Sequence, residues 1–194
     1  MDLMKRFLLF TGIVALAAPF AMAQTSTWAI DPAHSQIEFV VRHMTLSNIH
    51  GRFGNLKGNI TVNDTDVTKS TVEVTIDVTS LDTGVAQRDS DVKGPNFFDT
   101  AKFPSATFTS TSVAKKGMGL TVTGDLTLHG VTRPVELDVE GPSGPVPGMD
   151  KKPHSGYSAT TTINRKDFGV GANAPATMVG DEIKLTIDLD VAKQ

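Results

Sequence analysis

The sequence predicts an all-β fold built from one long antiparallel sheet. Three observations support this prediction: apolar and polar residues alternate in many segments, short turns rich in Gly, Asn, Asp and Pro separate them, and strands do not alternate with helices. A long antiparallel sheet leaves two unpaired edges, which closure into an eight-stranded β-barrel removes. A β-sandwich with a filled interior fits the same alternation, so the pattern alone leaves both architectures open.

The strand segments follow one another along most of the chain. In 70–79, for example, Val72, Val74 and Ile76 alternate with polar residues. Eight segments are expected near 26–30, 35–43, 52–63, 70–79, 106–114, 119–128, 132–140 and 156–164, with a ninth near 182–191. One short helix is expected near 85–93, ahead of Gly94-Pro95. The segment 141–148 holds three Pro and three Gly and is expected to be a loop.

The first 23 residues have the pattern of a secretory signal peptide. Lys5-Arg6 precede an apolar run over 7–18, and Ala21-Met22-Ala23 provide a small-x-small cleavage site. A membrane anchor is the alternative, but spanning a bilayer takes roughly 20 apolar residues. We therefore expect cleavage after Ala23 and a single exported domain over 24–194.

Composition and spacing argue against several functions. A net charge of −3 disfavours general nucleic-acid binding, and the absence of Cys excludes disulfides, iron–sulfur clusters and thiol catalysis. The five His do not pair at zinc-ligand spacing, and no Gly-x-Ser-x-Gly elbow occurs. We therefore expect no catalytic residues, no metal and no cofactor.

Two segments are unusually rich in small side chains, namely 106–113 and 157–162. Strands lined by small residues leave space that a packed core would fill. Solvent-facing edge strands would have the same composition, so the pattern leaves open whether the barrel is hollow.

Short sequence motifs follow one another in order across Asp31 to Val191. The most specific is Gly124–Val135, which reads GDLTLHGVTRPV. The others are Asp31-Pro32-Ala33-His34-Ser35, Gly51-Arg52-Phe53, Ser80-Leu81-Asp82-Thr83, Arg88-Asp89, Phe97-Phe98-Asp99, Arg165-Lys166-Asp167-Phe168-Gly169 and Val179-Gly180-Asp181-Glu182.

Taken together and in this order, these motifs resemble the YceI-like polyisoprenoid-binding family. The resemblance implies a lipocalin-like extended barrel in an exported, periplasmic bacterial protein. Such barrels hold a long apolar chain in an interior tunnel, with polyprenyl diphosphates, isoprenoid quinones and fatty amides as ligands. No catalytic activity is firmly attached to the family, so a non-enzymatic carrier is expected. The alternatives are an accessory or stress-protective partner of a membrane b-type cytochrome and a lipid-modifying enzyme. A homodimer is a further expectation from the family.

Residue type and placement suggest the parts of such a lipid site. The apolar wall is expected from Phe39, Val41, Phe53, Phe98, Phe108, Leu126, Ile163 and Phe168, and the polar head-group candidates are His34, Ser35, His43, Arg52 and Arg88. Arg88-Asp89 is either a ligand clamp or a structural ion pair. Phe97, Phe98 and Phe103 either plug one end of the barrel or line the mouth of the pocket.

Overall fold

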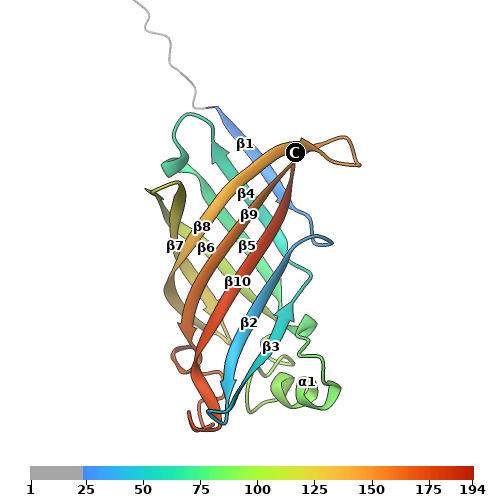
Figure 1. The fold of residues 1–194 in the computed structure, drawn as a ribbon, viewed down its shortest axis with the longest axis vertical. Helices are drawn as coiled ribbons and strands as arrows, with labels where there is room; N and C mark the ends of the chain where they lie inside the picture. Colours follow the sequence, from blue (N-terminus) through green and yellow to red (C-terminus); the bar gives the residue numbers. More distant parts are fainter. Residues whose placement is uncertain (1–23) are drawn as a thin grey trace, which may run out of the picture.

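The chain forms a closed antiparallel β-barrel in the computed structural model, which describes residues 24–194 (Figure 1). Eight strands complete the ring in the order β1-β4-β5-β6-β7-β8-β9-β10, and β10 pairs again with β1. This closure confirms the eight-stranded barrel and rules out the sandwich. The predicted signal peptide, residues 1–23, lies outside the described residues, so its cleavage stays a prediction.

The ten strands and one α-helix match most of the predicted segments. Their bounds are β1 (Thr25–Ile30), β2 (Gln36–His43), β3 (Ser47–Phe53), β4 (Lys57–Asn63), β5 (Thr71–Asp77), α1 (Ala86–Lys93), β6 (Ser105–Lys116), β7 (Gly119–Leu128), β8 (Val131–Pro147), β9 (Pro153–Asn164) and β10 (Val179–Lys193). The helix confirms the prediction near 85–93. No helix in the described part of the chain is long and apolar enough to cross a membrane.

Strand β10 holds two partners on one edge, and this arrangement closes the wall. Near its C-terminal end it pairs with β1, and over Val179–Asp188 it pairs with β2, which carries β3 on its other side. Between the two, the Ser35 hydroxyl donates to the Asp190 carbonyl (3.2 Å) and accepts from the Asp190 N–H (3.0 Å). The Asp190 carbonyl also accepts from the Asp31 N–H (2.8 Å), so the Ser35 side chain supplies the partner that the Asp190 N–H needs where β1 ends and β2 begins.

The prediction of one strand over 52–63 is wrong, because the chain breaks between β3 and β4. Asn55 has a positive φ of 53°, and the completely buried Leu56 turns into the core. The Ser80 hydroxyl accepts from the Gly54 N–H (2.9 Å) and donates to the Gly54 carbonyl (3.2 Å). These contacts give the backbone N–H and C=O groups of Gly54 hydrogen-bond partners at the break, so the interruption of the β-ladder costs little free energy.

The prediction of a loop over 141–148 is also wrong, because β8 continues to Pro147. Its pairing with β9 shifts register twice, between Glu140 and Ser143 and again between Ser143 and Val146. Bulges of this kind accommodate prolines, which cannot donate to a regular ladder. The segment is therefore an irregular strand that extends the β8–β9 hairpin.

The strand connections define two ends of the barrel. One end carries the β2–β3 turn, the 165–178 connection and α1, and we call it the helix end (Figure 1). The other carries the β6–β7 turn and the tip of the β8–β9 hairpin, and we call it the hairpin end.

A buried arginine organises the connection at the helix end. Arg165 is 3% exposed and its guanidinium forms an ion pair with Asp181 (2.8 Å). It also donates to the carbonyl oxygens of Val170, Gly171, Ala174, Val179 and Gly180. Buried charge is tolerated when it is paired and fully hydrogen-bonded, and here one side chain fixes the path of 165–181.

We expect Arg165→Met to lower the free energy of unfolding by about 3–5 kcal/mol, because it leaves Asp181 and several buried carbonyl groups without their donor. Urea unfolding followed by the fluorescence of Trp28, the single tryptophan, measures the change. Arg133→Met, at an exposed position of β8, is the matched control. Equal stability of the two variants would contradict the role assigned to Arg165.

Candidate functional site

The barrel is hollow and encloses two adjoining apolar cavities. The cavity at the helix end has a volume of about 300 Å³, and the cavity toward the hairpin end about 160 Å³. Four side chains line both cavities: Ile37, Ile76, Leu126 and Leu185. The two cavities therefore adjoin each other along the barrel and share part of their apolar wall. A volume of roughly 300 Å³ is at the lower limit of small-molecule pockets.

The strand alternation produces the apolar lining. On β2, Ile37, Phe39 and Val41 line the helix-end cavity. On β10, Ile183 and Leu185 line the same cavity, whereas Ile187 and Leu189 continue along the other. Because successive side chains of a strand point to opposite faces, every second residue adds to the apolar wall.

Small residues create part of the space. The sequence left open whether the small residues of 106–113 and 157–162 line a hollow barrel or belong to solvent-facing edge strands. Neither β6 nor β9 is an edge strand, since each pairs on both sides. Ala106 of β6 lines the helix-end cavity, and Ala159 of β9 lines the hairpin-end cavity. The small side chains of these strands thus contribute to a hollow interior.

Two glycines have a role in the cavity walls that the sequence analysis did not assign. A Cβ atom at Gly51 would overlap the Phe39 ring, and one at Gly124 would overlap the Phe108 ring. Each phenylalanine ring thus lies over a glycine of the neighbouring strand instead of projecting fully into the lumen. A glycine inside a strand often marks a close approach of this kind, so the position of these glycines within strands could have predicted their role.

The structure places most of the predicted apolar residues in the cavity walls. Phe39, Val41, Phe53, Phe98, Leu126 and Ile163 line the helix-end cavity, and Phe108 lines the hairpin-end cavity. Phe168 lines neither, because its 2% exposed side chain packs into the core cluster around Phe108 and Val170. Phe97 and Phe98 line the helix-end cavity, whereas Phe103 packs against His129 with ring centroids 4.5 Å apart.

The five polar candidates lie in three places. His43 and Arg88 line the helix-end cavity, whereas Arg52 pairs with Asp82 at 3.0 Å and lines neither cavity. Arg88 donates from Nε to the Thr83 hydroxyl and from Nη2 to the Thr83 carbonyl, both at 2.8 Å. Asp89 accepts from the Thr83 N–H at 2.8 Å. Arg88 and Asp89 therefore both hold Thr83, and they form no ion pair with each other within the described residues.

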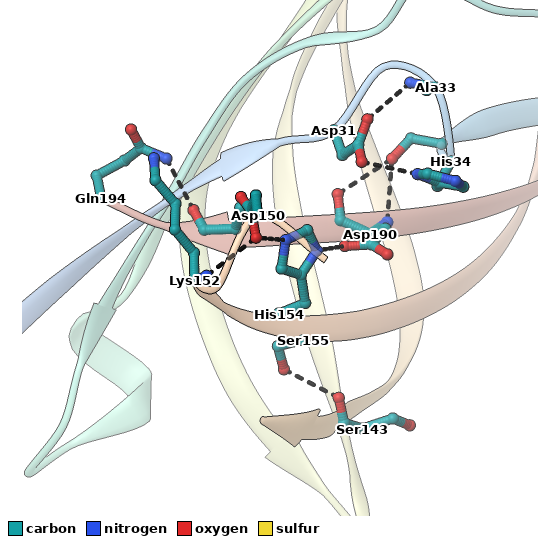
Figure 2. Close-up of polar contacts among 12 residues, drawn as sticks. Asp31, Ala33, His34, Ser143, Asp150, Lys152, His154, Ser155, Asp190 and Gln194 are labelled. Carbon is teal, nitrogen blue, oxygen red and sulfur yellow. Dashed lines mark hydrogen bonds and ion pairs between the residues drawn. The ribbon is translucent and has the colours of Figure 1, made fainter. Parts of the chain in front are cut away.

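His34 and Ser35 belong instead to a polar cluster on the outer wall (Figure 2). His34 Nδ1 lies 2.7 Å from Asp31 Oδ2, and Asp190 on β10 lies beside this pair. Side chains at Asp188 and Asp190 alternate with the inward Leu189 and Val191, so the cluster lies outside the apolar space. Oxygen and nitrogen atoms of Asp31, His34 and Asp190 lie within 4.8 Å of one another, a spacing that could hold a metal ion.

A second histidine, His154, links two carboxylates in the same cluster (Figure 2). Its Nδ1 lies 2.6 Å from Asp190 Oδ1, and its Nε2 lies 3.1 Å from Asp150 Oδ1. Both ring nitrogens can donate to these acceptors only when the imidazole is charged. The Asp190 hydrogen bond accordingly raises the pKa of His154 above its ordinary value of 6.5. The pKa of Asp150 is lowered, chiefly by the Lys152 backbone N–H.

This cluster is not where lipid-modifying chemistry would need it. Catalysis on a chain in the barrel requires a histidine and a carboxylate in contact with each other at the cavity mouth, within reach of the substrate. His43 and Asp91 both line the helix-end cavity, but no hydrogen bond or ion pair joins them among the described residues. The close pair of His34 and Asp31 lies on the outer wall, where His34 is largely exposed. The arrangement instead ties the β1–β2 connection and the β8–β9 hairpin to β10.

Comparisons with known proteins agree with this architecture. A family model described as YceI-like domain matches residues 28–191. A UPF0312 protein of Vibrio parahaemolyticus is 37% identical over 188 residues, covering 94% of this chain and 97% of the relative. A UPF0312 protein of Shewanella putrefaciens is 37% identical over 193 residues, covering 95% and 98%.

Solved structures share the barrel. The crystal structure of Burkholderia cenocepacia BcnA has a TM-score of 0.71 at 26% identity and covers 83% of this chain and 98% of its own. A polyisoprenoid binding domain from Saccharophagus degradans has a TM-score of 0.64 at 19% identity, covering 86% and 98%. At the latter identity the likeness establishes the fold alone.

We expect His154→Gln to lower the melting temperature most in mildly acidic buffer just below pH 6.5, where the imidazole of the wild type is charged. Because folding raises the pKa of His154, its contribution is complete below 6.5 and is lost as pH rises through the folded-state value. Thermal unfolding across a pH series measures this difference, and His50→Gln, at an exposed position of β3, is the control. A deficit that is the same in acidic and alkaline buffers would exclude a charged clamp.

Proposed function

The chain belongs to the YceI-like domain family, and we propose that it is a non-enzymatic carrier that holds one long apolar lipid inside its barrel. The ligand class is a polyisoprenoid, an isoprenoid quinone or a fatty amide. The pair of adjoining apolar cavities lined by β2, β6, β9 and β10 is the observation that carries the proposal. The family and its polyisoprenoid-binding structural neighbour suggest a binding protein rather than an enzyme.

The energetics of apolar burial favour a long chain over a short one. Each buried methylene contributes about 0.8 kcal/mol, whereas association costs about 4–15 kcal/mol before any net affinity appears. A ligand of a few carbons therefore gains too little, and a chain that runs from one cavity into the other gains enough. Apolar contacts discriminate weakly between such chains, so tunnel length and the polar groups at the mouth must set specificity.

The helix end is the place we assign to the head group. Arg88 and His43 line the cavity there, and Arg88 Nη1 has no hydrogen-bond partner among the described residues. Thr83 holds the other two guanidinium nitrogens, so the free nitrogen is presented with little loss of side-chain entropy. A polar or anionic head group would accept a hydrogen bond from it.

The predicted signal peptide supports a role outside the cytoplasm. The leader-like residues 1–23 and the absence of cysteine suit a periplasmic carrier whose stability depends on its sheet and core. The b-type cytochrome partner and the homodimer remain predictions from the family resemblance.

Organic extraction of the purified protein followed by mass spectrometry tests the proposal. We expect a stoichiometric long-chain lipid in the wild type and its loss in Ala106→Phe, because the added ring occupies the helix-end cavity. Ala114→Phe, at an exposed position of the same strand, should retain the lipid.

Two results would overturn the carrier role. One is a wild-type protein that carries no lipid and takes up none from an added isoprenoid quinone. The other is lipid content that stays the same in Ala106→Phe although circular dichroism shows that the barrel is intact.

A further inference from the structure

Three large apolar side chains are exposed beside one another at the helix end. Met44 is 53% exposed, Leu46 is 76% exposed and Met178 is 52% exposed. The Met44 N–H donates to the Met178 carbonyl at 2.9 Å, and the Leu46 N–H donates to the His43 carbonyl at 2.9 Å. We call these three residues the apolar rim. Met178 and His43 line the helix-end cavity, so the rim borders its mouth.

The turn that carries the rim is conformationally unfavourable for its residues. Met44 and Thr45 have positive φ angles of 49° and 59°. Glycine or asparagine adopts this region at lower cost, and either would also be more soluble in an exposed turn. The conformation of the turn therefore does not explain why an exposed methionine occurs at position 44. A role for its apolar side chain explains it.

The charged side chains that line this cavity are mainly cationic, although the chain as a whole is acidic. The chain carries a net charge of −3, but the turn segment 42–48 contains Arg42 and no acidic residue. Arg42 and Arg88 both line the cavity, and neither forms an ion pair within the described residues. Asp91 is the acidic residue of the lining. Cationic groups next to apolar side chains match a membrane surface with anionic head groups.

The proposed cargo requires such a surface. A long apolar chain loses about 0.8 kcal/mol of favourable transfer for each methylene that it exposes to water. Passage through bulk water is therefore slow, and a mouth pressed against a bilayer avoids it.

We propose that the apolar rim is a membrane-docking surface, through which the barrel exchanges its lipid with a bilayer that carries anionic head groups. This inference rests on the proposed function. Its test is chosen so that the docking surface and the carrier role can fail separately.

The hairpin end provides a matched control. Met118, Val146 and Met149 are also exposed there, but Met118 lies in the β6–β7 turn and the other two lie in the β8–β9 hairpin, away from that turn (Figure 1). These residues line neither cavity. Replacing them removes as many exposed apolar side chains without changing the mouth.

The experiment measures co-sedimentation of the purified protein with vesicles of phosphatidylethanolamine containing phosphatidylglycerol, and with vesicles of pure phosphatidylcholine. We expect the wild type to bind the anionic vesicles more strongly. The rim variant Met44→Ser/Leu46→Ser/Met178→Ser should bind them about tenfold more weakly, because three side chains no longer enter the interface. The control variant Met118→Ser/Val146→Ser/Met149→Ser should bind as the wild type does.

The docking surface would be overturned if the wild type did not bind vesicles, or if the rim and control variants bound them equally. It would also be overturned if sedimentation velocity showed a dimer that the rim variant abolishes, because a second copy of the chain would then cover the rim. Extraction and mass spectrometry of the same preparations separate the two proposals. If the wild type carries lipid but does not bind vesicles, the carrier proposal stands and the docking surface is rejected. If the wild type binds vesicles but carries no lipid, the docking surface stands and the carrier proposal is rejected.

Discussion

Closure of the sheet along β10 is the constraint on which the rest of the structure depends. One strand serves two partners on the same edge, and the Ser35 hydroxyl completes the hydrogen bonding of Asp190 where the partners change. If this seam opened, the sheet would regain free edges and its apolar inner face would meet water. An enclosed apolar space can exist only because every inward side chain is surrounded by a continuous wall.

The wall and the cavity place the polar groups of the protein in two separate settings. The Asp150–His154–Asp190 clamp and the Asp31–His34 pair lie outside the wall, where they tie the β8–β9 hairpin and the β1–β2 connection to β10. Arg88 and His43 lie at the helix end of the cavity. The first set therefore supports the seam, and the second set lines the cavity.

Alternation in the sequence predicted the barrel and most of its lining, because period two alone decides which side chains face inward. Phe39, Val41 and Leu126 follow from that rule. It cannot locate a break such as the one at Asn55, where a positive φ and the Ser80 contacts override a strand-like pattern. It also cannot show that β8 absorbs its prolines as bulges, since register shifts depend on the partner strand. Alternation also does not show how far along the barrel axis a residue lies. His34 and His43 were both head-group candidates, but His34 pairs with Asp31 in the outer cluster and His43 lines the cavity.

A hollow barrel gives up packing that a filled core would have, because lining atoms lose contact partners across the empty space. The structure offsets this loss with contacts that do not enter the lumen, including the Arg165 hydrogen bonds at the helix end and the Phe rings that lie over Gly51 and Gly124. The empty form would then be less stable than a form loaded with the proposed ligand, since a ligand that binds only the native state adds stability that grows with the logarithm of one plus the ratio of free ligand concentration to Kd. The same cavity that weakens the core is what allows a long apolar chain to complete it, so ligand affinity and the stability deficit of the empty barrel have a common physical origin.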